Sequence, residues 1–101
     1  HKPSIIQKKD ERCYLCMLLD EENGVKKTQE HHIFGGPNRD HSEETGLKVY
    51  LCLEHHTAGK FAVHRCKDTR RFLERTAQRE FEENHSREEF MEIFGKNYLD
   101  D

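Results

Sequence analysis

The stretch LCLEHH, residues 51–56, places a cysteine and two adjacent histidines directly after a short apolar run. Cys52 and His55 are separated by two residues, and the cysteines of CYLC, residues 13–16, have the same spacing. Such spacing lets a tight turn present two ligands to one ion. Zn²⁺ is usually tetrahedral and takes thiolate and imidazole ligands, so the two halves together predict a structural zinc site. The predicted zinc ligands are Cys13, Cys16, Cys52 and His55.

Other uses of the cysteines remain open at this point. An even number of cysteines also permits disulfide pairs or reduced buried thiols, but the pairing of Cys52 with a histidine and the lack of a signal peptide favour metal. The 35 residues between the two halves imply that a whole subdomain is threaded between them. Cys66 lies outside both halves; we expect a small buried residue or free thiol, with replacement of a zinc ligand as the alternative.

Length and composition indicate one domain that needs help from more than its core. The chain has 101 residues, of which 37% are charged and 33% hydrophobic, and it lacks tryptophan. A domain of this size buries little apolar area, and a metal site would add stability. No run approaches the roughly 18 apolar residues of a membrane span, and no signal-peptide segment is evident. We therefore expect a soluble, intracellular protein without membrane partners, and we assign His1 no role.

The net charge of −3 conceals a strong asymmetry along the chain. Residues 60–79 carry a charge of +5, whereas residues 1–59 carry −2 and residues 80–101 carry −6. The basic segment is therefore the natural place for an anionic partner, although its arginines could equally solvate a helix face.

Hydrophobic patterning and turn signals predict a small α+β fold. Residues 1–12 show no period and should form an extended arm, and Glu22-Asn23-Gly24 should turn. We then expect a strand over 28–34 stopped by Gly35-Gly36-Pro37, a polar loop over 38–45, and a second strand over 47–51, whose sequence alternates. Three helices should follow: one over 54–61 that is interrupted or ended near Gly59, one over 68–83 capped by Asp68 or Thr69, and one opened by the capping box Ser86 to Glu89 and closed by Gly95.

Each histidine pair is expected to divide between two tasks. Adjacent side chains of a strand point to opposite faces, so His31 and His32 cannot normally bind one ion together. On a helix start, adjacent residues lie about 100° apart, so His55 can bind zinc while His56 turns toward the first strand. His31 and His56, with His64 as a third ligand, would form a partial shell around a second metal ion. The alternative for His31 and His32 is that they are solvated or hydrogen-bonded histidines of a polar edge strand. The alternative for His64 is a structural histidine whose ring nitrogens are hydrogen-bonded.

The ordered combination of these motifs resembles a known family. Cys13-x-x-Cys16, His31-His32-Ile33, a strand, and Cys52-x-x-His55-His56 resemble the HNH endonucleases, and the chain is most similar to small phage-encoded members, including the kind associated with recombination. The resemblance covers residues 13–66. It implies a ββα-metal (His-Me finger) core with a structural, treble-clef-like zinc knuckle over 13–66, a flexible arm over 1–12, and a helical extension of two C-terminal helices over 67–101.

The resemblance also implies roles for the histidines. The first histidine of the family's strand motif binds the catalytic divalent ion and falls on His31, and the second, the general base, falls on His32. The helix histidine after the second knuckle is a metal ligand and falls on His56, and a further ligand falls on His64. One departure concerns the family's middle Asn, whose place is occupied by Leu47; either Asn38 or a backbone carbonyl substitutes, or the site is weakened.

The implied activity is metal-dependent hydrolysis of DNA phosphodiester bonds. His32 would activate water, a divalent cation such as Mg²⁺ would stabilise the phosphate, and the zinc would be structural. DNA is the expected partner, with a recombination or replication protein as a further one, and a phage-encoded chain would act in the cytoplasm of a bacterial host. The residues expected to contact DNA phosphates are Arg65, Lys67, Arg70 and Arg71.

Two other function classes compete with the nuclease. A non-catalytic, zinc-stabilised module that binds nucleic acid or protein is supported by the missing Asn, but such a module needs neither His32 nor His56. A redox protein that uses Cys13 and Cys16 lacks the expected βαβ context.

Overall fold

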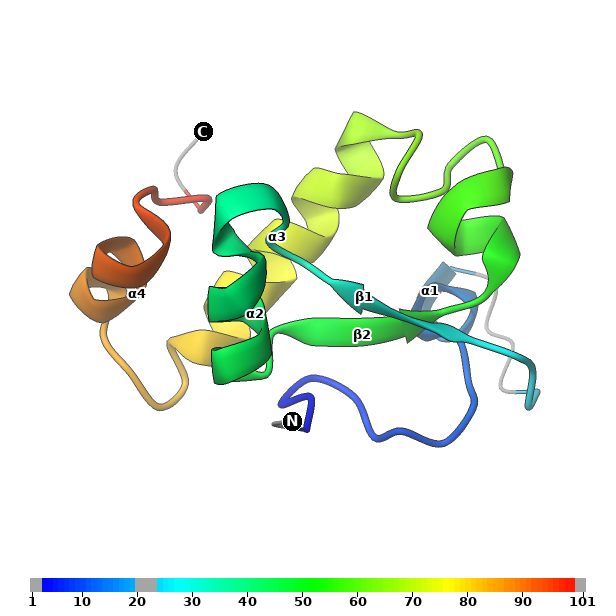
Figure 1. The fold of residues 1–101 in the computed structure, drawn as a ribbon, viewed down its shortest axis with the longest axis horizontal. Helices are drawn as coiled ribbons and strands as arrows, with labels where there is room; N and C mark the ends of the chain where they lie inside the picture. Colours follow the sequence, from blue (N-terminus) through cyan, green and yellow to red (C-terminus); the bar gives the residue numbers. More distant parts are fainter. Residues whose placement is uncertain (1–2, 20–23, 100–101) are drawn as a thin grey trace.

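The computed structural model describes residues 3–19 and 24–99. Figure 1 shows a short β-hairpin with α3 behind it, α4 at one end of the molecule and α1 near the other. The α+β fold with two C-terminal helices agrees with the prediction. The elements of the described residues are α1 (Tyr14–Leu19), β1 (Gln29–His32), η1 (Gly36–Asn38), α2 (Arg39–Thr45), β2 (Lys48–Leu51), η2 (Glu54–Ala58), α3 (Lys67–Phe81) and α4 (Arg87–Phe94).

The register of the hairpin sorts the histidines and their neighbours onto two faces. β1 and β2 pair antiparallel, with His31 opposite Val49 and His32 opposite Lys48. Side chains alternate along a strand and directly opposed residues share a face. His31 and Val49 therefore lie on one face, and His32 and Lys48 lie on the other.

The second strand is more buried than its sequence indicates. The strand predicted over 47–51 is confirmed as β2, Lys48–Leu51. Although its sequence alternates between apolar and polar residues, all four residues of β2 are buried, and Lys48 is only 1% exposed. Its edge is also occupied: the N-terminal arm bonds to it through Ser4, whose hydroxyl donates to the carbonyl of Lys48, and through Gln7, whose side-chain oxygen accepts from the backbone N–H of Tyr50.

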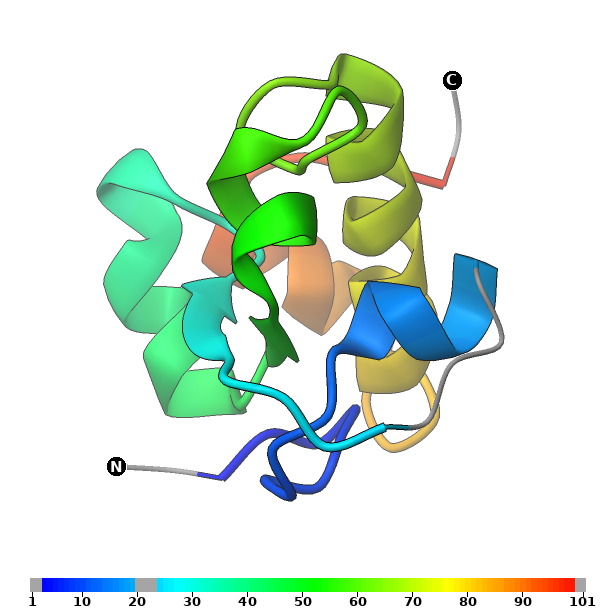
Figure 2. The same ribbon diagram turned by 90° about the vertical axis from the view of Figure 1, so that its right-hand side faces the viewer.

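The core lies between the hairpin and the helices. α3 contributes three residues at helical spacing, Leu73, Ala77 and Phe81, which are at most 3% exposed, whereas Phe72, also predicted for the core, is 37% exposed. Figure 2, turned by 90°, shows α1 toward the viewer and α4 behind, with the N-terminal arm running below the hairpin. The buried core residues are Cys13, Leu15, Cys16, Ile33, Phe34, Leu47, Val49, Leu51, Cys52, Val63, Leu73, Ala77, Phe81, Phe90 and Phe94.

The last helix has both predicted ends. The Ser86 hydroxyl accepts from the backbone N–H of Glu89, the Glu89 carboxylate accepts from the backbone N–H of Ser86, and Gly95 adopts the left-handed conformation with φ of 78°. Phe34, two residues beyond the end of β1, lies 4.6 Å from Phe94 and 5.6 Å from Phe90 between ring centroids. These ring contacts fasten α4 to the strand that carries the histidines.

Three predictions of local structure need correction. Residues 39–45 form α2, not a polar loop. The sequence of this helix, RDHSEET, contains no apolar residue, so it shows no hydrophobic period, and the residue that it buries is Ser42. Residues 14–19 form α1, which was not expected and which begins inside the first cysteine pair. α3 starts at Lys67 with Cys66 as its N-cap, so the predicted cap at Asp68 or Thr69 is wrong.

The remaining expectations concern the arm, the turn and the membrane. Residues 3–12 contain no helix or strand, and the backbone N–H of Ile5 donates to the carbonyl of Gly46. The turn expected at Glu22-Asn23-Gly24 lies outside the described residues at its first two positions. Among the helices that the structure describes, none has the length and apolar character needed to span a bilayer.

Candidate metal centres and active-site cleft

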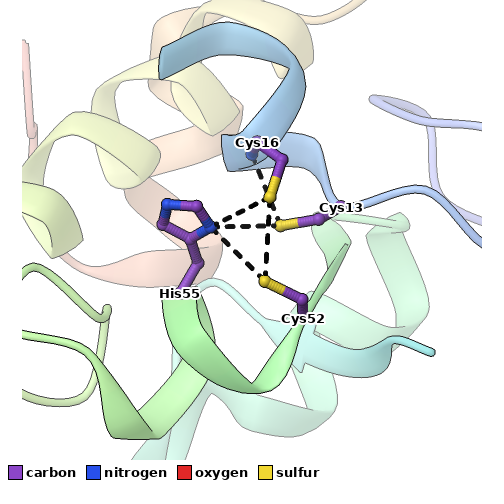
Figure 3. Close-up of side chains that lie close together, drawn as sticks. All are labelled: Cys13, Cys16, Cys52 and His55. Carbon is purple, nitrogen blue, oxygen red and sulfur yellow. Dashed lines mark hydrogen bonds between the residues drawn. The ribbon is translucent and has the colours of Figure 1, made fainter. Parts of the chain in front are cut away.

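Cys13, Cys16, Cys52 and His55 meet in one cluster, drawn in Figure 3. The His55 Nδ1 atom lies 3.3 Å from the Cys16 Sγ and 3.5 Å from the Sγ atoms of Cys13 and Cys52. The Sγ atoms of Cys16 and Cys52 are 3.8 Å apart. All three cysteines are buried, with at most 7% exposure. These are the four residues for which the sequence predicted zinc.

The spacing within this cluster fits a tetrahedral zinc ion. Ligand atoms at about 2.3 Å for sulfur and about 2.0 Å for nitrogen from such an ion lie roughly 3.5–3.8 Å from one another. Three thiols and one imidazole are also the donor set that zinc prefers. Burial raises the pKa of the Cys16 thiol to about 12; the hydrogen bond from Lys26 opposes this rise, and the neighbouring sulfurs of Cys13 and Cys52 add to it. Without an ion the cluster would hold a neutral thiol there, and a dication is what makes a thiolate stable at this position.

Two short helical segments bring these ligands together. Cys13 precedes α1 and Cys16 lies in its first turn, where the backbone N–H of Cys16 points to the Cys13 Sγ at 3.4 Å. Cys52 ends the hairpin, and His55 lies on η2, a single π-helical turn in which the N–H of Gly59 donates to the carbonyl of Glu54. Single π-helical turns occur often at functional sites. The cluster thus ties α1 to the C-terminal end of β2.

His31, His56 and His64 form a second cluster of possible metal ligands. The ring centroids of His31 lie 5.3 Å from those of His56 and 5.2 Å from those of His64. The Nε2 atoms of His56 and His64 are 3.0 Å apart. Two nitrogens bound side by side at about 2.1 Å from one ion would be roughly 3.0–3.4 Å apart, so this spacing suits a shared cation.

The surroundings of His31 and His56 favour the neutral forms of these two imidazoles. Burial, with added repulsion from His56, His64 and His32, lowers the pKa of His31 to about 3. Burial and the nearby His64 also lower the pKa of His56. Metal ions bind neutral imidazole, so a cluster that disfavours protonation is poised to accept a cation.

Gln29 holds the ring of His56 from outside the cluster. The His56 Nδ1 atom lies 2.6 Å from the side-chain oxygen of Gln29. Because that oxygen only accepts, Nδ1 carries the proton and Nε2 keeps its lone pair beside His64. Such outer partners orient ligand histidines in metal sites. Gln29 and His31 are two residues apart on β1, so their side chains share a face of the strand. This spacing is the signal in the sequence that could have identified Gln29 as a neighbour of the histidine cluster.

A cleft of about 480 Å³ contains the three-histidine cluster. Two arginines line it, Arg39 at the start of α2 and Arg70 on α3. Arg70 also donates to the carbonyl of Val63 at 3.1 Å, which fixes its guanidinium beside the histidines. Burial raises the pKa of Glu74, which lines the same cleft, although four nearby cations oppose the effect.

His32 borders this cleft but makes its contacts on the other face of the hairpin. Its Nε2 atom lies 2.8 Å from Oε1 of Glu43 on α2. Its side chain is 8% exposed. The structure thus separates His31 from His32 by face, as strand geometry requires, and places both on the rim of one cleft.

The four residues expected to contact DNA occupy different surroundings. Arg70 lines the histidine cleft, whereas Arg65, Lys67 and Arg71 are not among the residues that line it. Arg65 donates to the carbonyl of Ala58 on η2 at 2.9 Å.

One cysteine and two histidines of the described residues, Cys66, His41 and His85, lie away from both clusters. Cys66 is half-buried at the N-terminus of α3, and it belongs to neither metal cluster. His41 and His85 each lie within 3.5 Å of an exposed glutamate.

Several residues near the cleft were not anticipated, among them Arg39, Glu43 and Lys48. Glu43 and Lys48 flank His32, and Arg39 lines the cleft. Glu43 and Arg39 lie in the segment taken for a loop. The register that opposes Lys48 to His32 cannot be read from either strand alone.

Comparison of the chain with protein families, curated proteins and solved structures finds no match. The class that fold and site define is therefore a small α+β protein with a buried cluster of three cysteines and one histidine that has the geometry of a structural zinc site. The role of the three-histidine cluster has to be argued from its chemistry.

Proposed function

We propose that this protein is a metal-dependent DNA endonuclease of the HNH class, with a ββα-metal core stiffened by a structural, treble-clef-like zinc knuckle. The observation that carries the proposal is the cleft in which His31, His56 and His64 converge, with His32 and two arginines on its rim. In this arrangement β1, β2 and η2 supply the two strands and the helical turn of the core.

The ligand set supports a catalytic rather than a structural second ion. Three imidazoles leave at least one coordination position for water or a phosphate oxygen. His64 is exposed, so this position is reachable from solvent. A divalent cation held there would supply fixed positive charge for the phosphate oxygens as negative charge develops on them.

His32 is the residue assigned to proton transfer. A neutral imidazole accepts a proton from water as that water attacks phosphorus in line with the departing 3′ oxygen. With Nε2 directed to Glu43, the nitrogen that can accept this proton is Nδ1. Proton transfer by a positioned side chain contributes typically about 10²- to 10⁴-fold to a rate.

Arg39 and Arg70 are suited to hold the DNA backbone in the cleft. Guanidinium groups bind phosphate through two parallel hydrogen bonds, and Arg70 is already fixed by its bond to Val63. Arg65, Lys67 and Arg71 would extend the contact along the basic segment. Binding through phosphates would be salt-dependent and largely independent of sequence.

The direct test is cleavage of DNA by the zinc-loaded protein. Supercoiled, linear and single-stranded DNA are incubated with Mg²⁺, Mn²⁺ or no added ion, and nicking is followed on gels. We expect cleavage that needs the added ion and that His32→Ala reduces by about 10²-fold or more. The matched control is His41→Ala, because the His41 side chain is 43% exposed and is not among the residues that line the cleft. Equal cleavage by His32→Ala and wild type would remove His32 as the base.

A non-catalytic, zinc-stabilised module that binds nucleic acid or protein is the second candidate. One observation favours it: the His32 side chain is 8% exposed and already bonded to Glu43, which limits its access to water. Under this hypothesis the protein would bind DNA in a salt-dependent manner, or not at all, but would cleave no substrate with any ion of the panel. The same gels, together with a binding titration, distinguish the two candidates.

A further inference from the structure

Four side chains form a polar cluster on the face of the hairpin opposite His31. His32 lies directly across from Lys48, and Glu30 lies two residues before His32 on the same face. Glu43 reaches this face from α2, where its Oε1 accepts from His32 at 2.8 Å. We call Glu30, His32, Glu43 and Lys48 the base cluster.

Lys48 occupies the centre of the base cluster. Its Nζ lies 3.1 Å from Glu43 Oε1, 3.3 Å from Glu43 Oε2 and 3.1 Å from Glu30 Oε2. A buried charge persists only when it is paired and hydrogen-bonded, and both conditions hold here. Burial alone would lower the pKa of Lys48, but the bonds to Glu30 and Glu43 outweigh it and raise that pKa. The ammonium therefore takes the place that a metal ion would need among these carboxylates.

Glu43, rather than Glu30, is the partner of His32. The distance from His32 Nε2 is 2.8 Å to Glu43 Oε1 but 3.8 Å to Glu30 Oε1, which is beyond a hydrogen bond. The bond from His32, followed by that from Lys48, lowers the pKa of Glu43 to about 2, so Glu43 is a carboxylate under working conditions. A carboxylate only accepts, which requires a proton on Nε2 of a neutral His32.

The neighbour of Glu43 on α2 holds the backbone that follows β1. The Ser42 hydroxyl accepts from the N–H of Phe34 at 3.0 Å and donates to the carbonyl of Phe34 at 2.9 Å. Asn38, considered as a substitute for the missing Asn, instead lies 3.5 Å from the carbonyl of Phe94. Adjacent residues of α2 thus hold the loop and the histidine ring.

We propose that Glu43, locked in place by Lys48, is a positioning residue that holds His32 in the tautomer with its proton on Nε2 and its lone pair on Nδ1. The effect of Glu43 on catalysis rests on the proposed nuclease function. The assignment of the His32 tautomer does not depend on that function. In the family that the sequence resembles, the middle Asn, whose place is Leu47 here, orients the loop and the base histidine. In this chain Ser42 would hold the loop and Glu43 the histidine ring. Glu43 and Lys48 are not among the residues that line the cleft, so they act on the reaction through His32.

The tautomer can be read directly by NMR. Zinc-loaded protein with ¹⁵N-labelled histidine is recorded at a pH where His32 is neutral, and its two ring nitrogens are distinguished by two-bond correlations. We expect the Nε2–H form in wild type, a shift toward a mixture in Glu43→Ala, and retention of the form in Glu43→Gln, whose amide oxygen still accepts. The matched control is Glu44→Ala, because Glu44 is the next residue on α2, is 73% exposed and contacts His41 instead.

Cleavage kinetics on a short duplex supply the second readout. A partner that orients a functional histidine is typically worth about 10- to 100-fold. Glu43→Ala should therefore lower kcat by about that factor with KM unchanged, Glu43→Gln should recover most of the loss, and Glu44→Ala should match wild type. If Glu43→Ala does not fold because Lys48 is left underpaired, the double variant Glu43→Ala with Lys48→Met removes the buried charge and gives the same two readouts.

The possible outcomes separate this inference from the proposed function. An unchanged Nε2–H tautomer in Glu43→Ala, or in the double variant, overturns the positioning role, whatever the nuclease assay shows. A tautomer change together with a parallel fall in kcat supports both. A tautomer change in a protein that cleaves no DNA with any ion supports the role of Glu43 in holding the ring and overturns the nuclease.

Discussion

The two metal-ligand clusters differ in ligand chemistry and in burial, although one helical turn contributes to both. The cysteine cluster has three buried thiols and His55, which is a complete tetrahedral set. The histidine cluster has three imidazoles, of which His31 is buried and His64 is exposed at a cleft. His55 and His56 are neighbours on η2, yet each joins a different cluster. A full, buried set suits a structural ion, and an incomplete, exposed set suits an ion that acts on a substrate.

The largest effect is expected when the cysteine cluster loses its structural ion. Cys13→Ala, or removal of zinc with a chelator, should unfold the chain, because binding at such sites is worth on the order of 10 kcal/mol while small domains have only about 5–15 kcal/mol of net stability. Metal analysis of the native protein should find one tightly held zinc per chain, and circular dichroism should show the loss of structure. Cys66→Ser should keep both the zinc and the fold, and a folded, zinc-free protein would contradict the assignment.

The next largest effect separates the neighbours on η2. His55→Ala should lose both the zinc and the folded structure, because it removes one of the four zinc ligands. His56→Ala should keep zinc and fold but should lose binding of the second divalent ion, and it should cleave DNA about 10²- to 10³-fold more slowly, the loss typical for removing one electrostatic stabiliser. Zinc content, thermal unfolding and cleavage rates measured on both variants check this; similar behaviour of the two would mean that the clusters are not functionally distinct.

A smaller effect is expected at the rim of the open cluster. Arg70→Gln removes a cation that lines the cleft, whereas Arg79→Gln removes an exposed one on α3 that is not among the cleft residues. Each lost phosphate contact should lower the slope of log affinity against log salt by about 0.9. Titration of labelled duplex DNA at several salt concentrations should show this for Arg70→Gln only; equal slopes for the two variants would place DNA elsewhere on the molecule.

The smallest effect concerns the charge balance beside His32. Because the folded protein raises the pKa of Lys48 above its unfolded value, the stability from its ion pairs is fully present below a pH of about 10.5 and is lost as pH rises further. One proton contributes at most about 1.4 kcal/mol per pH unit. The unfolding free energy, measured with denaturant between pH 9 and 12, should therefore fall more steeply with Lys48 than in Lys48→Met. Both proteins are measured in a Tyr50→Phe background, because burial raises the pKa of Tyr50 and Lys48 opposes that rise. Parallel curves would show that Lys48 keeps its ordinary pKa.

The elements that could be predicted are those whose signals are local. The capping box at Ser86 and the glycine at position 95 mark the two ends of α4, because each satisfies backbone groups within one turn. α2 could not be found in this way. This helix buries Ser42 rather than an apolar stripe. Its contact with the core is made by hydrogen bonds between Ser42 and Phe34, which lie eight residues apart in the sequence.

The exposure of particular residues also depended on distant parts of the chain. Lys48 is 1% exposed because α2 and β1 bring two carboxylates to it, and nothing in the local sequence distinguishes it from a lysine on an open strand. Phe72 shows the reverse case: its spacing matches the core stripe of α3, but it lies at the edge of that stripe and stays 37% exposed.

By itself the sequence determined which residues could share an ion and which could not. The two-residue spacings of Cys13, Cys16, Cys52 and His55 limit them to tight turns, and strand alternation separates His31 from His32, because covalent geometry acts over one or two residues. Only the tertiary structure decided that His64 joins His31 and His56, and that Glu43 and Lys48 hold His32. Those contacts span 5 to 33 residues and depend on hairpin register and helix packing, which are set by the burial of the whole core rather than by any one segment.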